Sequence, residues 1–144
     1  VESSTMPVVF NMLTLFIGSL MTYLGINGES FFLFAVLLFI DYITGITKAR
    51  CMSAAITSNR MKYGIISKLS LLLIPLILAI GAKAVNADFS TVLLVGINIL
   101  VLSEVYSIIG NIYTIRTREE LPEYDVVAIL GKRIRNILIR YGEE

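Results

Sequence analysis

Four long apolar stretches, separated by short polar breaks, occupy the chain up to about residue 115. A helix of about 20 residues crosses a hydrocarbon core about 30 Å thick, so each stretch is long enough to span a bilayer. The breaks at residues 25–28 and 86–88 are short enough for tight turns, so each is expected to join an antiparallel hairpin. The pattern predicts an all-α integral membrane protein with four transmembrane helices in two hairpins, from about Pro7 to Leu24, Ser30 to Lys48, Tyr63 to Val85 and Phe89 to Ile115.

A different pattern follows Pro122, which suits the start of a new helix. The acidic Glu123 and Asp125 near its beginning and the basic Arg135 and Arg140 near its end complement a helix dipole. Basic residues lie largely on the other face from an apolar set at helical spacing, so we expect an amphipathic cytoplasmic helix. It can lie on anionic lipid, pack on the four-helix body or pair with another copy. The apolar set is Val126, Val127, Leu130, Ile134, Ile137, Leu138 and Tyr141.

The distribution of charge supplies an orientation. Residues 48–68 contain five basic residues and no acid, which predicts a cytoplasmic loop between the second and third spans. With four spans, both termini are then expected to be cytoplasmic. The chain divides accordingly into a four-helix transmembrane domain, residues 1–115, and a cytoplasmic amphipathic tail, residues 116–144. The basic residues of this stretch, from the end of the second span to the beginning of the third, are Lys48, Arg50, Arg60, Lys62 and Lys68.

Composition supports a membrane protein and argues against catalysis. Hydrophobic residues make up 56% of the chain, and the mean hydropathy is +0.82, both too high for an ordinary soluble domain. There is no histidine, and Cys51 is the single cysteine, so a histidine-dependent catalytic set, an internal disulfide and a thiolate metal cluster are all excluded. We expect no enzyme activity, catalytic residue, cofactor or metal. Nucleic-acid binding is not expected either, because membrane topology already accounts for the basic residues.

Polar residues inside the spans recur at helical spacing. A carboxylate at the centre of a membrane helix costs about 2.5–3.5 kcal/mol on insertion scales, so it requires a partner, a proton or a function. The stripe either locks helices together by interhelical polar contacts or faces a polar lumen or a subunit interface. The residues of this predicted stripe are Asp41, Thr44, Gly45 and Lys48 in the second span, Lys68 in the third, and Glu104, Ser107 and Asn111 in the fourth.

Several of these residues belong to short motifs that resemble a known family. DYITGITKA, residues 41–49, resembles the signature at the end of a span in the phage lysis and toxin-secretion holin family. The family then has a Lys-x-Gly, matched by residues 62–64, and a lysine a few residues later, matched by Lys68. SEVYSIIGN, residues 103–111, is similar to its Glu and Ser motif ending in Asn, and Pro122 matches a following proline. The resemblance covers roughly residues 31–122.

The resemblance implies a small protein that accumulates in the cytoplasmic (inner) membrane of an infected bacterium. There it assembles into homo-oligomers in the lipid bilayer and opens lesions at a set time. A cell-wall-degrading endolysin, or in some relatives a toxin, escapes through them and the host lyses. On this reading the polar stripe would be hidden within a subunit or against a neighbour and would later line a wetted opening.

Two alternatives stay open on the sequence alone. The chain can be a small four-span channel or transporter for ions or protons that uses Asp41 or Glu104 as the coupling carboxylate. It can also be a membrane scaffold that recruits a cytoplasmic partner through residues 116–144.

Overall fold

The computed structural model describes residues 2–85, 90–123 and 125–143, and this part of the chain is helical, without strands. The first four helices are long and apolar enough to cross a membrane, which confirms the all-α prediction with four candidate spans. The turn predicted at residues 86–88 and the span start predicted at Phe89 lie outside the described residues. The helices are α1 (Glu2–Leu24), α2 (Gly28–Cys51), α3 (Ser58–Val85), α4 (Ser90–Thr117) and α5 (Val126–Gly142).

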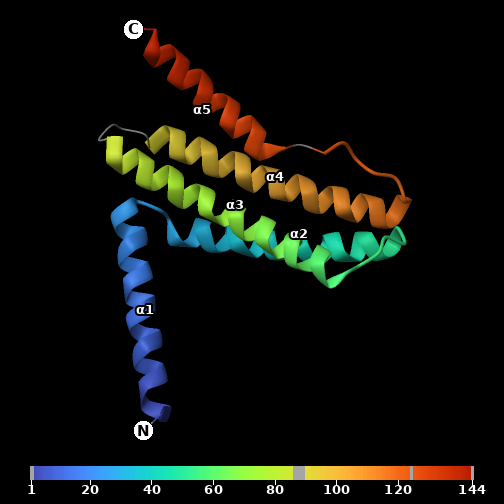
Figure 1. Cartoon of the computed structure of the whole chain (residues 1–144), viewed down its shortest axis with the longest axis horizontal. Helices are drawn as coiled ribbons and strands as arrows, with labels where there is room; N and C mark the ends of the chain where they lie inside the picture. The colour runs from blue at the N-terminus through green and yellow to red at the C-terminus, as the bar shows by residue number, and fades with distance from the viewer. Residues whose placement is uncertain (1, 86–89, 124, 144) are drawn as a thin grey trace.

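The helices α2, α3 and α4 lie side by side and form the body of the molecule (Figure 1). Their interior is built around Phe34 and Leu38 of α2 and Leu100 of α4, all of them buried. Val126, the first residue of α5, completes this cluster. The amphipathic helix is therefore fixed to the body at its beginning, and Figure 1 shows the rest of it leaving the body at an angle.

The C-terminal helix begins later than its sequence suggests. Asp125 is the N-cap, and its carboxylate accepts a hydrogen bond from the backbone N–H of Ala128 at 3.0 Å. Pro122 and Glu123 precede the helix instead of forming its first turn. An aspartate cap satisfies an N–H that the helix itself leaves unpaired, which explains why the start lies here.

The predicted tight turn between the first two helices is present, but the side-by-side hairpin is not. Gly25 has φ +70°, and the Asn27 side chain caps α2 by accepting from the N–H groups of Glu29 and Ser30. From this turn α1 leaves at a steep angle to α2 (Figure 1). Among residues 5–24 of α1, only those of the last turn pack, where Leu24 is buried with residues of the turn and α3. Between Met6 and Leu20 the exposed large hydrophobic side chains are spread around α1, so no one face is selected for packing on the body.

The contact between α2 and α3 depends on a glycine. A Cβ at Gly64 would lie 3.1 Å from Cε2 of Tyr42, whose hydroxyl donates to the carbonyl of Met61 at 3.3 Å. We expect Gly64→Ala to destabilise the protein by about 1–3 kcal/mol, because a rigid ring has to move. Thermal unfolding in detergent measures this. Gly81→Ala in the same helix is the control, since a Cβ there meets nothing within 4 Å. Equal melting temperatures for both variants would contradict the close packing.

Candidate functional site

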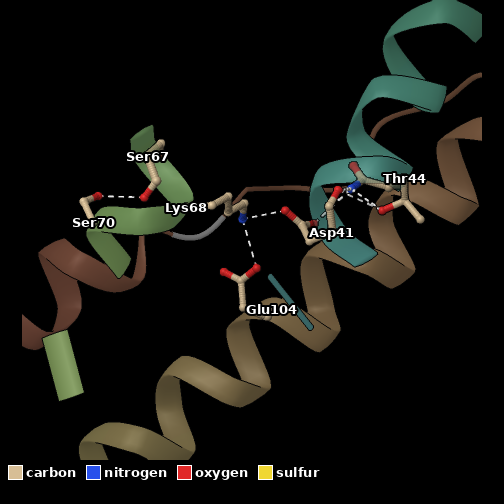
Figure 2. Close-up of polar contacts among 7 residues, drawn as sticks. Asp41, Thr44, Ser67, Lys68, Ser70 and Glu104 are labelled. Carbon is tan, nitrogen blue, oxygen red and sulfur yellow. Dashed lines mark hydrogen bonds and ion pairs between the residues drawn. The ribbon is translucent and has the colours of Figure 1, made fainter. Parts of the chain in front are cut away.

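A lysine from α3 stands between a carboxylate from α2 and one from α4, and thereby joins the three helices of the body (Figure 2). Nζ of Lys68 lies 2.5 Å from Oδ2 of Asp41 and 2.9 Å from Oε2 of Glu104. Both carboxylates are buried, with 5% of Asp41 and 3% of Glu104 exposed. This arrangement, here called the ion cluster, consists of Asp41, Lys68 and Glu104.

Hydrogen bonds extend the ion cluster toward the Thr117 end of α4. Nδ2 of Asn111 donates to Oδ1 of Asp41 at 3.0 Å and to Oγ1 of Thr44 at 3.1 Å. The Thr44 hydroxyl donates to the carbonyl of Asp41 at 3.0 Å. A Cβ at Gly45 would lie 3.8 Å from Nδ2 of Asn111, so this glycine leaves room for the amide. Asn111 thus holds one oxygen of Asp41 while Lys68 holds the other.

The ion cluster contains one cation and two carboxylates. With all three groups ionised its formal charge is −1, in a bundle whose outer surface is apolar. Removing charged groups from water costs several kcal/mol each, and pairing offsets that cost only where hydrogen bonds are complete. Lys68 pairs with both carboxylates. Asp41 also accepts a hydrogen bond from the Asn111 amide, which does not reach Glu104. The cluster is therefore held together tightly but carries an excess of acid.

Two further residues of the predicted stripe lie beside the ion cluster. Lys48 pairs with Glu120 at 3.1 Å, so its partner comes from beyond α4. Ser107 lines a cavity of about 710 Å³, whose wall includes Lys48, Lys68, Glu104 and Asn111. A smaller cavity of about 220 Å³ contacts Lys68 from the side of Asp41. The structure thus brings Asp41, Thr44, Gly45, Lys68, Glu104 and Asn111 together and places Lys48 and Ser107 at the edge.

Two features near this site escaped the sequence analysis. Thr114 is completely buried, and its hydroxyl has no hydrogen-bond partner within the described chain. It continues the spacing of Glu104, Ser107 and Asn111 by one more turn, a signal that was available in the sequence. The second feature is the segment after α4, where Glu120 pairs with Lys48 near the end of α2. The opposite charges of the two segments were also visible in the sequence.

The chemistry of the site is that of a charge held within an apolar bundle. Across the described residues, no group of three or more histidine, cysteine, aspartate or glutamate side chains is arranged to hold a metal ion. The three charged groups of the ion cluster come from three different helices, so each is paired across a helix–helix contact. Any separation of α2, α3 and α4 therefore exposes ionised groups that water stabilises.

Comparison with known proteins places the chain in a family. A family model described as the bacteriophage holin family matches residues 18–123. The match contains α2, α3, α4 and every residue of the ion cluster and its hydrogen-bonded extension. No curated protein and no solved structure matches the chain. Together with four helices that are long and apolar enough to span a membrane, the match shows that the chain is a membrane protein and belongs to the bacteriophage holin family.

Proposed function

We propose that the protein assembles into homo-oligomers in the cytoplasmic membrane of a bacterial host and permeabilises it. Through the resulting lesions an endolysin, or a toxin, leaves the cytoplasm and the host cell lyses. Membership of the holin family supports this function. The observation that carries it is the ion cluster, where two buried carboxylates share one lysine between three spans.

The ion cluster has one more carboxylate than it has cations, and this excess negative charge favours opening of the closed subunit. Ionised groups in a low-dielectric bundle are stable only while their partners stay in place. In a water-filled opening the same groups gain hydration, so the cluster favours a lumen-facing position whenever subunits rearrange. The proposed lining of this water-filled opening consists of Asp41 and Thr44 from α2 and Glu104, Ser107 and Asn111 from α4.

The proposed orientation places the loop between α2 and α3 and both termini in the cytoplasm. Cys51, at the end of α2, is then on the cytoplasmic side and can be tested as the single cysteine of the chain. We expect a membrane-impermeant maleimide to label Cys51 in inverted vesicles but not in intact spheroplasts. Glu29→Cys in a Cys51→Ser background, at the other end of α2, serves as the control with the opposite pattern. Labelling of Cys51 from outside would reverse the proposed topology.

Expression in a bacterial host tests the function itself. We expect an abrupt loss of membrane potential after a delay, and a fall in culture turbidity only when an endolysin without its own export signal is expressed as well. An ion or proton channel or transporter, the alternative function, would change the potential without releasing the endolysin. Gradual depolarisation with the endolysin retained in the cytoplasm would therefore overturn the proposal in favour of that alternative.

A further inference from the structure

Residues 118–123, which follow α4, double back along the body instead of projecting away from it (Figure 1). We name these residues the return segment. Two contacts tie it to α2: the Arg118 guanidinium donates to the carbonyl of Cys51, and Glu120 pairs with Lys48 at 3.1 Å. The segment therefore bridges the ends of two helices that the ion cluster also joins.

Two further contacts tie the return segment to α4 itself. The hydroxyl of Tyr106 donates to the carbonyl of Pro122 at 2.8 Å, and that of Tyr113 donates to Oε2 of Glu119 at 3.2 Å. Tyr106 precedes the last residue of α4, Thr117, by eleven positions (117 − 106), which is about 16 Å along a helix. The return segment thus reaches well back along α4.

The backbone at the start of the return segment adopts a conformation that side chains disfavour. Arg118 has φ +65°, and its N–H donates to the carbonyl of Thr114 at 2.8 Å, which ends α4. The left-handed region is costly for a residue with a Cβ, so other contacts have to hold Arg118 there. The reversal of the chain after α4 is therefore maintained by the contacts of the segment and not by a glycine.

The return segment closes one side of the large polar cavity. Leu121, Pro122 and Glu123 form part of the wall of the cavity of about 710 Å³, whose wall also includes Lys68 and Glu104. Lys68 and Glu104 of the ion cluster therefore share this cavity with the return segment. An opening that widens the cavity on this face has to displace the segment.

The charge of the return segment does not suit contact with lipid. Glu119, Glu120 and Glu123 are exposed, and the segment that carries them runs back along α4, one of the four helices long and apolar enough to span a membrane. A charged side chain facing hydrocarbon is costly, so this face of the body suits water or protein. A second copy of the chain that packed into this cavity would also have to displace the return segment.

On the basis of the proposed function, we propose that the return segment is a strap that holds the subunit closed, and that it must lift from α4 before a lesion forms. In the closed subunit the strap covers the polar cavity beside the ion cluster. Lifting it breaks the contacts to Tyr106 and Lys48 and opens the cavity to water or to a neighbouring copy.

A disulfide can lock the strap in place. A Cβ at Gly110 would lie 3.9 Å from Cβ of Leu121, within the range of about 3.5–4.5 Å that disulfides require. We therefore choose Gly110→Cys with Leu121→Cys in a Cys51→Ser background, which removes the native thiol. Each single cysteine variant in that background is a control, because it carries the same substitution without the lock. A shift in thiol titration and gel mobility shows whether the bond has formed.

Purified full-length protein is reconstituted into phosphatidylethanolamine and phosphatidylglycerol vesicles that hold a fluorescent dextran. We expect the oxidised double variant to lose dextran release completely and to recover it with dithiothreitol. The single variants are expected to release dextran at the same rate with and without reductant. The strap proposal would be overturned if the oxidised double variant released dextran as fast as the same variant treated with dithiothreitol. It would also be overturned if the disulfide failed to form. If the Cys51→Ser parent releases no dextran and supports no lysis, the proposed function fails instead, and the strap with it.

A charge reversal provides a second test that needs no crosslink. Glu120→Lys sets a second cation against Lys48 and is expected to speed dextran release by up to about fivefold, the factor that about 1 kcal/mol represents. Glu143→Lys, an equal change of charge just beyond the end of α5, is the matched control and is expected to leave the rate unchanged. Equal rates for the two variants would count against the strap, because the contact to Lys48 would then hold nothing closed.

Discussion

Lys68→Leu is expected to prevent stable accumulation of the protein in the membrane. The substitution leaves Asp41 and Glu104 buried and without their shared cation. Removing one partner of a buried ion pair costs about 3–5 kcal/mol, because the remaining charge keeps its desolvation cost and loses its compensation. Here two carboxylates depend on one lysine, so the loss falls at the upper end of that range. The measurement is the amount of full-length protein in the membrane fraction, together with its melting temperature in detergent.

Two controls separate the loss of the charge pair from the loss of a lysine in α3. Lys83→Leu changes a residue of the same helix whose Nζ lies 5.0 Å from the ring centroid of Tyr23. An exposed cation–π contact contributes about 0.5–1 kcal/mol, so this variant is expected to accumulate normally. A triple variant with leucine in place of Asp41, Lys68 and Glu104 is expected to recover the accumulation, because an apolar core can replace a buried ion cluster without net cost. Normal accumulation of Lys68→Leu would show that Lys68 does not stabilise the body.

Removal of either carboxylate is expected to abolish or strongly delay lysis while leaving the protein in the membrane. In Asp41→Leu or Glu104→Leu one lysine faces one carboxylate, so the remaining pair is neutral and the cost of burial falls. The excess acid that favours a wetted opening is then gone. Of the two, Asp41→Leu is expected to cost more stability, because the Asn111 amide also donates to Asp41. Glu104→Leu is therefore the cleaner test of function.

The measurement is the time from induction to loss of membrane potential, with membrane-bound protein quantified in parallel. The control is Asn98→Leu, which removes an exposed polar side chain of α4, the helix of Glu104, outside the ion cluster. Cells that express this variant are expected to lyse on the normal schedule. Asp41→Asn removes the charge but keeps a side chain of equal size. Normal timing in both Asp41→Leu and Glu104→Leu would show that the ion cluster only fastens the helices together.

Much of the architecture follows from one-dimensional patterns. The apolar stretches that become α2, α3 and α4 are recognisable because length and hydropathy alone determine whether a helix suits a bilayer. The polar stripe was also recognisable, since Asp41 and Thr44 share a helical face by spacing alone, as do Glu104 and Asn111. The motifs around residues 41–49 and 103–111 pointed to the holin family, which the match over residues 18–123 confirms.

The start of α5 and the course of the chain before it were less accessible to such patterns. The proline at residue 122 suggested a helix start, but the cap is Asp125. Local rules name several residues able to begin a helix, and tertiary contacts select among them. Here Val126 enters the cluster of Phe34, Leu38 and Leu100, which draws the first turn of α5 onto the body.

By itself the sequence determined the number and approximate position of the membrane-length helices, the residue types inside them and the face on which the polar ones lie, although α3 begins at Ser58, five residues before the predicted start at Tyr63. Only the tertiary structure decided that a single Lys68 serves both carboxylates, that α1 leaves the body instead of pairing with α2, and that residues 118–123 fold back over the polar cavity. The reason is physical: periodicity describes one helix at a time, whereas these features depend on which side chains of different helices come within a few ångströms of one another.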